Sequence, residues 1–160
     1  MKKTILIIFS ILIMKSIGST QTKKHNIIGV WQVYSPTIGS AWNAHYRFFK
    51  NGTFKYSFSQ YDNRGRIEAA KGSFRLHGDT LTLIIKTRIE RVGGDLVGGG
   101  MGFQQDELVL DGTQDIEVKQ KNTNPIDINI EWLTRKGIKA FKLQNNTYYL
   151  ISTDPHNQDD

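Results

Sequence analysis

The chain has 160 residues, of which 38% are hydrophobic and 22% charged, with a formal net charge of +6 and no cysteine. This length suits one domain with a full core. The lack of cysteine excludes a disulfide framework and a lipid-attachment cysteine, so the core alone must hold the fold together.

Residues 1–20 have the pattern of a secretory signal peptide. Met1, Lys2 and Lys3 form a basic start, and an apolar stretch covers residues 4–14. This stretch is shorter than the roughly 20 apolar residues of a membrane-spanning helix, and small residues follow it, as signal cleavage requires. We therefore expect a secreted or periplasmic protein with no membrane span after cleavage, with an uncleaved anchor as the alternative.

The charge of the mature chain is only mildly basic. Cleavage would remove Lys2, Lys3 and Lys15, leaving 18 basic against 15 acidic residues and a net charge of +3. The remaining Lys and Arg alternate with apolar residues, as at Lys55 and Lys86, which is typical of a solvated strand face. Since no basic cluster is present, we expect no nucleic-acid partner.

Alternation of apolar and polar residues recurs from Trp31 to Ser152, interrupted by short turns of Asn, Gly, Asp and Lys. Alternation with period two indicates half-buried strands, and sequential strands usually pair. The sequence predicts an all-β domain over residues 27–153, an antiparallel up-and-down meander of roughly eight to ten strands. A short segment (21–26) would precede it and a polar tail (154–160) follow it. The expected strands cover residues 28–34, 44–49, 53–60, 67–77, 80–90, 107–110, 116–120, 126–135, 138–144 and 147–152.

Three two-residue loops define the register of neighbouring strands, because a slip of one residue would invert a strand. These loops are predicted at residues 78–79, 136–137 and 145–146. Each brings apolar residues together on one face. The resulting pairs are Leu76 with Leu81, Phe74 with Leu83, Trp132 with Phe141, Ile130 with Leu143, Leu143 with Tyr148 and Phe141 with Leu150.

The turn at Asn51 and Gly52 requires a different loop, because a two-residue turn would mix polar and apolar faces. A three-residue loop over 50–52, with Gly52 left-handed in a bulge, restores the alternation. It pairs Phe48 with Phe54, Tyr46 with Tyr56 and Ala44 with Phe58.

This bulged register turns His45 and Arg47 away from the apolar face. In the alternative register both would enter the barrel and form the best acid–base or anion-binding pair of the chain. An enzyme working inside the barrel would depend on that alternative.

The predicted inner face is rich in aromatic side chains. A ring of eight strands can be filled by side chains or can hold one small ligand, and aromatic residues suit both arrangements. The inner face carries Trp31, Tyr46, Phe48, Phe54, Tyr56, Phe58, Phe74, Leu83, Ile85, Ile128, Ile130, Trp132, Phe141 and Tyr148. The predicted ligand-binding residues are Tyr46, Phe48, Tyr56, Phe58, Ile85, Ile130 and Trp132.

Gly29, Val30 and Trp31 resemble the Gly-x-Trp signature that opens the first strand of lipocalins and of the wider calycin superfamily. The leader and the hairpins over 46–54 and 72–81 are similar to those of lipocalin-like domains in bacterial envelope and secreted proteins. The resemblance implies a β-barrel that binds a small, mostly apolar molecule without a reaction, plugged at one end by Gly29 and Trp31. The chain lacks the Arg that packs on this Trp in lipocalins and the Thr-Asp-Tyr motif of their middle strands.

No motif in the chain points to catalysis. The Gly-rich stretch 93–102 lacks the Gly-Lys-Ser/Thr ending and the following helix of a phosphate loop, and it suits a lid over the barrel mouth or a plain connection. His25, His45, His77 and His156 are not at metal-ligand spacing, and no Gly-x-Ser-x-Gly occurs. We expect no metal, no cofactor and no enzyme.

The sequence therefore favours a secreted or periplasmic protein that binds a small hydrophobic or amphipathic molecule inside a lipocalin-like barrel. The alternative is a filled barrel that acts as an envelope or secreted protein-interaction module, with an envelope protein as its partner.

Overall fold

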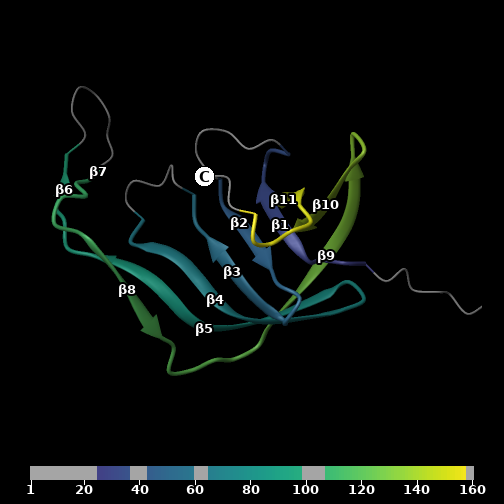
Figure 1. Cartoon of the computed structure of the whole chain (residues 1–160), viewed down its shortest axis with the longest axis horizontal. Coiled ribbons are helices and arrows are strands. Elements are labelled where there is room, and N and C mark those ends of the chain that lie inside the picture. Colours follow the sequence, from purple (N-terminus) through teal and green to yellow (C-terminus); the bar gives the residue numbers. More distant parts are fainter. Residues whose placement is uncertain (1–24, 37–42, 60–64, 99–106, 158–160) are drawn as a thin grey trace, which may run out of the picture.

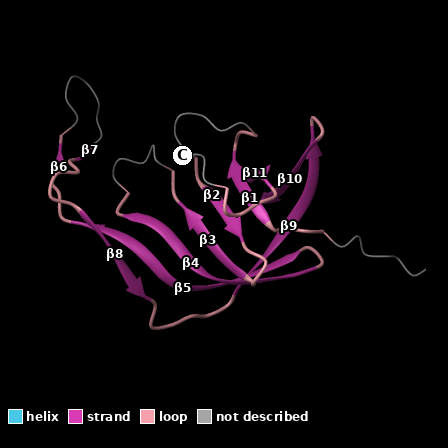
Figure 2. Ribbon diagram, viewed as in Figure 1, coloured by secondary structure: helices cyan, strands magenta, loops and turns pink. Residues whose placement is uncertain are grey.

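The computed structural model describes residues 25–36, 43–59, 65–98 and 107–157. The predicted signal peptide lies outside these ranges. Every regular element within them is a β-strand (Figure 2). The strands are β1 (Gly29–Val33), β2 (His45–Phe48), β3 (Thr53–Ser57), β4 (Ile67–His77), β5 (Thr80–Val92), β6 (Leu96–Val97), β7 (Glu107–Leu108), β8 (Gln114–Lys119), β9 (Ile126–Arg135), β10 (Ile138–Leu143) and β11 (Asn146–Ser152).

Nine of these strands form one sheet, in the order β4-β3-β2-β1-β11-β10-β9-β5-β8, and every pairing in it is antiparallel. A further pairing of β4 with β5 closes all of them except β8 into a ring. Strands β6 and β7 pair separately, beyond the far ends of β5 and β8 (Figure 1). The prediction of an all-β antiparallel fold is confirmed, and its strands close into a ring.

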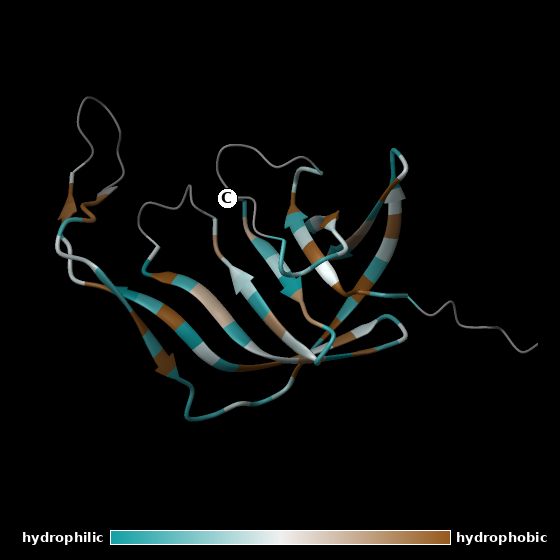
Figure 3. Cartoon of the chain, viewed as in Figure 1, coloured by the Kyte–Doolittle hydropathy of each residue, from teal (hydrophilic) through white to brown (hydrophobic). Residues whose placement is uncertain are grey.

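The predicted strands agree well with the observed ones. All ten are present, and β4 and β9 have the predicted bounds. Alternating apolar and polar bands run along the strands, most plainly in β9 (Figure 3). The strand that the sequence did not predict is β6, which has two residues and lies inside the Gly-rich stretch. Such a short strand carries too little alternation to be recognised.

The bulged turn between β2 and β3 is confirmed. Phe48 lies opposite Phe54 and Tyr46 opposite Tyr56, as the three-residue loop predicts. Gly52 has a φ of +78°, the left-handed conformation that glycine adopts without steric cost. His45 and Arg47 consequently lie on the face opposite the apolar side chains, so the acid–base pair inside the ring does not form.

The loops at residues 78–79 and 136–137 are also confirmed, but the predicted loop at 145–146 is wrong. The two-residue loop lies one position earlier, at Gln144 and Asn145, so that Leu143 pairs with Asn146 and Phe141 with Tyr148. The error shifts the pairing by two residues. Since side chains alternate with period two, such a shift leaves every side chain on its face, and the hydrophobic pattern could not detect it.

Strand β5 exchanges one neighbour for another along its length. Residues 80–83 pair with β9, whereas residues 87–92 pair with β8 on the same edge. The connection from β8 to β9 therefore crosses this edge, and Gln120 N–H donates to the Lys86 carbonyl there, at 2.8 Å. A plain meander has no such exchange. Its effect is that β9 and β8 separate from each other along β5, with the β8–β9 connection between them.

The core lies inside the ring and contains most of the predicted inner face. Its buried members are Ile27, Trp31, Val33, Tyr46, Phe48, Phe54, Leu81, Leu83, Ile130, Phe141, Leu143 and Tyr148. Partly buried residues pack against them, namely Ala44, Tyr56, Phe74, Leu76, Ile85, Ile128, Trp132 and Leu150. Phe58 is 40% exposed and lies at the rim.

Candidate functional site

The centre of the ring is filled by aromatic side chains. Trp31, Phe48 and Phe141 are fully buried, and the Trp31 ring lies 5.0 Å from Phe141. Tyr46 stacks on Phe48 with ring centroids 5.3 Å apart. Because aromatic rings in such contact leave little space between them, any ligand site must lie away from this centre.

One end of the ring is built around Trp31. Its indole N–H donates to the Ile27 carbonyl at 2.7 Å, and its ring meets Trp132 edge to face at 6.0 Å. His25 stacks on the outer side of Trp132, with ring centroids 4.4 Å apart. Trp132 and His25 thus cover Trp31. The last two strands, β10 and β11, contain no Arg that could do so.

Gly29 has a conformation and an environment that only glycine suits. Its φ is +134°, and a Cβ atom there would overlap the Ser152 carbonyl oxygen of β11. The Gly-x-Trp sequence is therefore explained by local geometry, with the glycine admitting β11 and Trp31 filling the core.

A cluster of tyrosines lies on the same inner face, where Tyr46 is opposite Trp31. The Tyr46 ring lies 4.4 Å from Tyr56 and 5.3 Å from Tyr148. Burial raises the pKa of Tyr46 and of Tyr148 well above the ordinary value, and Tyr56 and Tyr148 share a hydrogen bond. Tyr34 extends the cluster by donating to Asn146 Oδ1 at 3.0 Å. The tyrosine hydroxyls are thus largely engaged with protein groups.

A cavity of about 410 Å³, the mouth cavity, lies between β4, β5 and the β8–β9 connection. Its apolar walls are Phe58, Ile67, Ala70, Ile85 and Ile126. Its polar lining consists of Arg88 and the β8–β9 connection, with Gln120, Asn122, Thr123 and Asn124. Phe58, Ile67 and Ile126 are each 39% to 45% exposed, so the apolar wall faces solvent.

Arg88 is the cation of the mouth cavity. The register places it opposite Ala70 on β4 and Val118 on β8. It forms an ion pair with Glu90, the next residue on the same face of β5. Arg88 and Glu90 thus form a charged pair beside an apolar wall.

The predicted ligand-binding residues divide into three groups. Phe58 and Ile85 line the mouth cavity, and Tyr56 contacts Phe58 at 5.0 Å. Tyr46, Phe48 and Ile130 are buried in the core. Trp132 lies at the Trp31 end, and its indole N–H has no acceptor among the residues that the structure describes.

Sequence reasoning missed the remaining lining residues. Ile67 and Ala70 lie on β4, Arg88 on β5 and Ile126 at the start of β9, so the cavity combines residues that are far apart in the sequence. One signal was available, because Ile84 and Ile85 are adjacent apolar residues in an otherwise alternating strand. The register indeed shifts nearby, between Lys71 and Gly72 on the facing strand.

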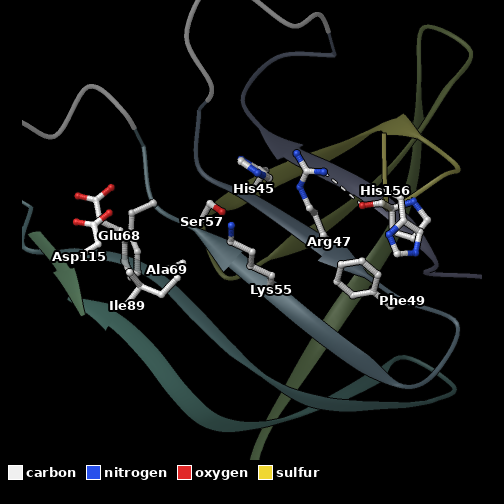
Figure 4. Close-up of a pocket in the computed structure, with 12 residues that line it drawn as sticks. His45, Arg47, Phe49, Lys55, Ser57, Glu68, Ala69, Ile89, Asp115 and His156 are labelled. Atoms are coloured by element: carbon white, nitrogen blue, oxygen red, sulfur yellow. Dashed lines mark hydrogen bonds between the residues drawn. The ribbon is translucent and has the colours of Figure 1, made fainter. Parts of the chain in front are cut away.

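A second cavity, the outer cavity, has about 420 Å³ and lies on the opposite face of β2, β3 and β4 (Figure 4). Its lining includes His45, Arg47, Lys55 and Ser57 on β2 and β3, with Glu68 and Asp115 grouped at the far side. Pro155 and His156 close it at the other side. The predicted polar tail is therefore partly folded, with Pro155 buried.

His45 in the outer cavity is a neutral imidazole at neutral pH. Its side chain is 5% exposed, and burial lowers its pKa from 6.5 to about 4, assisted by the nearby charges of Arg47 and Lys55. Nδ1 lies 2.9 Å from the Asn43 carbonyl, which can only accept, so the Nδ1 of the neutral ring carries the proton.

Comparison with protein-family models, with curated proteins and with solved structures finds no match for this chain. Within the described ranges, no group of His and carboxylate side chains has the arrangement of a metal site. The same ranges contain no helix of the length and apolarity that crossing a membrane requires.

Proposed function

We propose that this protein is a secreted or periplasmic, lipocalin-like barrel that binds a small amphipathic molecule in the mouth cavity. The observation that supports the proposal is a cavity of about 410 Å³ that is lined by five apolar side chains and one cation, Arg88. Ligand pockets typically measure about 300 to 1,000 Å³ and combine an apolar lining with a few polar groups. The mouth cavity has both properties.

The ligand would have an aliphatic body and an anionic end. Phe58, Ile85 and Ile126 offer apolar surface to the body, and burying it yields roughly 25 cal/mol per Å². Arg88 offers a guanidinium, which suits a carboxylate because it presents paired donors. Asn122 and Asn124 offer amide groups at the rim.

The packed core limits how far the ligand can enter. Phe48, Phe141 and Trp31 fill the centre, so the site is a rim site and not a deep pocket. We expect a ligand of modest length and moderate affinity, because part of its surface would stay in water.

The first experiment is a native mass spectrum of the protein purified from its own host, before and after organic extraction. An extractable adduct with the mass of a small lipid or metabolite would support the proposal and identify the ligand. The second is a titration of the extracted protein with dodecanoate. Saturable binding is expected, and its absence together with a bare chain in the spectrum would refute the proposal.

A variant pair tests whether binding uses the mouth cavity. Ala70→Phe adds a ring inside the cavity and should abolish dodecanoate binding. Leu110→Ala removes an exposed apolar side chain that does not line the cavity, and it should leave binding unchanged. Equal binding by wild type and Ala70→Phe would place the ligand elsewhere.

A second candidate function is protein interaction by a filled ring. It is favoured by the packed core and by four exposed apolar residues at and beside the β6–β7 pair, namely Leu96, Val97, Val109 and Leu110. Monomeric proteins seldom expose grouped apolar side chains without a partner. A wild-type protein that binds no apolar probe would favour this function.

A further inference from the structure

Three basic side chains lie in register across neighbouring strands on the outer face of the ring. Arg47 on β2 lies directly opposite Lys55 on β3, and Lys55 lies directly opposite Lys71 on β4. We call these residues the basic row. Like charges in directly opposite positions destabilise a sheet, so the arrangement calls for compensating negative charge.

The neighbouring carboxylates compensate only part of the basic row. Lys71 pairs with Glu117 at 3.3 Å. Glu68 and Asp115 both pair with Arg91, at 2.9 and 3.0 Å, so one cation serves two carboxylates at the far side of the outer cavity. Lys55 remains with a cation on each side, and it makes no ion pair with any residue in the described ranges.

Lys55 is also partly withdrawn from water. Burial lowers its pKa, and the charges of Arg47 and Lys71 lower it further. A cation with these surroundings gains stability when an anion binds beside it. The uncompensated charge therefore faces a cavity and not open solvent.

Arg47 is held in a defined position beside Lys55. Its Nη1 donates to the Asn157 carbonyl at 2.8 Å and to the Pro155 carbonyl at 3.3 Å. His156 packs on Phe49 with ring centroids 5.1 Å apart, which fixes the tail against β2. A guanidinium positioned by the backbone loses less freedom when it binds a ligand.

The next register position adds neutral polar groups. Ser57 lies opposite His45, and both line the outer cavity beside Arg47 and Lys55 (Figure 4). Since the His45 ring is neutral, the positive charge of this side of the cavity comes from Arg47 and Lys55. Arg47 and Lys55 supply two positive charges and Ser57 a hydroxyl on this side of the cavity. These groups suit a doubly charged oxyanion better than a singly charged carboxylate.

We propose that the outer cavity binds a phosphate group, either inorganic phosphate or the phosphate of a small monoester. Arg47 and Lys55 would contact its oxygens and Ser57 would donate from its hydroxyl. The cavity, at about 420 Å³, is larger than phosphate alone needs, and Phe49 and Ile89 offer apolar surface to an attached organic group. This site lies on the outer face of β2, β3 and β4 and meets the mouth cavity only at Phe58, which lines both cavities, and it does not depend on the proposed carrier function.

The test is a calorimetric titration of the full chain with inorganic phosphate at constant ionic strength. Wild type should bind phosphate saturably at millimolar concentrations or below. Lys55→Gln should weaken binding at least about tenfold, the effect of losing one charged hydrogen-bond donor. Lys139→Gln, at an exposed position of β10, removes the same charge away from the cavity and should change the affinity less than about twofold.

Two further measurements separate binding from folding. Without phosphate, Lys55→Gln should melt at the wild-type temperature or higher, because it removes like-charge repulsion, and Lys55→Arg should retain phosphate binding. Absence of saturable binding by wild type, or wild-type affinity in a folded Lys55→Gln variant, would overturn the proposal.

A parallel titration with glycerol phosphate distinguishes the two sources of the phosphate group. Tighter binding than inorganic phosphate, lost in Lys55→Gln, would support the site with a monoester as its ligand. Equal affinity for both, also lost in that variant, would support the site with inorganic phosphate as its ligand. Weak binding that Lys55→Gln leaves unchanged would contradict both forms.

Discussion

Gly29 in β1 lies so close to Ser152 in β11 that any side chain at position 29 would meet the Ser152 carbonyl oxygen. The φ of +134° adds a backbone conformation that other residues rarely adopt. The two strands approach here beside Trp31, at the end of the ring that Trp132 covers. This contact therefore joins the first strand of the ring in the sequence, β1, to the last, β11.

Replacing Gly29 by alanine should destabilise the protein by about 2 to 3 kcal/mol, since the change combines backbone strain with an overlap between neighbouring strands. Urea unfolding followed by tryptophan fluorescence measures the loss. Gly137→Ala is the matched control, because Gly137 also has a positive φ of +79° but has open space around it. It should cost only about 1 kcal/mol. Equal losses in the two variants would show that strand proximity at Gly29 contributes nothing.

His45 should make stability depend on pH below neutrality. Its pKa is about 4 in the folded state and 6.5 in the unfolded chain, so between these values the unfolded state binds more protons. Stability from this group is therefore complete above pH 6.5 and falls as the pH drops towards 4, by at most about 3 kcal/mol.

Urea unfolding at a series of pH values between 7 and 4.5 tests this expectation. His45→Asn keeps a donor near the Asn43 carbonyl but cannot be protonated, so its stability should vary less across this range. Both proteins contain the same carboxylates, so the contribution of these groups to the pH dependence cancels when the stability of one protein is subtracted from that of the other. Parallel curves for the two proteins would show that His45 is not buried as the structure has it.

The outcome at the turns shows what the hydrophobic pattern can determine. At Asn51 and Gly52 the competing loop lengths differed by one residue, so they placed different side chains inside, and the pattern selected the right one. At Asn145 the competing loops differed by two residues in pairing and kept the same faces. The hydrophobic pattern could not distinguish these two loops, because side chains alternate with a period of two.

The two cavities depend on contacts between residues far apart in the sequence, which a local sequence pattern does not predict. The mouth cavity lies where β5 passes from pairing with β9, through residue 83, to pairing with β8, from residue 87, and the adjacent Ile84 and Ile85 are only a weak local sign of this exchange. The outer cavity depends on Pro155 and Asn157 reaching Arg47 across more than 100 positions. Phe58 and Ile85 were identified because they continue the inner face to the rim.

The tyrosine hydroxyls should contribute to stability independently of any ligand. Tyr56→Phe removes the hydrogen bond with Tyr148 and leaves a buried hydroxyl without that partner. The expected loss is about 1 to 2 kcal/mol. Tyr149→Phe, on the neighbouring position of β11, changes the same group outside the cluster and should cost under about 0.5 kcal/mol. Chemical denaturation measures the stability of both variants. If Tyr56→Phe were as stable as wild type, a water molecule would be replacing Tyr56 as the hydrogen-bond partner of the Tyr148 hydroxyl.

Arg88 should determine which end group the mouth cavity accepts. Arg88→Gln removes the guanidinium but keeps a polar side chain of similar reach, and its free partner Glu90 then lies near the site. Loss of one charged hydrogen bond, with Glu90 uncompensated, should weaken dodecanoate binding about tenfold or more. Dodecanol has the same chain without the carboxylate, so its affinity should be nearly unchanged.

The comparison of these two ligands separates a carboxylate contact from a general effect on the cavity. Fluorescence displacement of an apolar dye measures both affinities in wild type and in Arg88→Gln. If the variant lost dodecanoate and dodecanol equally, Arg88 would be shaping the apolar wall and not recognising an anion. A selective loss of dodecanoate would assign the anionic end of the ligand to Arg88. The aliphatic body would then lie towards Phe58 and Ile126, because these apolar side chains line the same cavity.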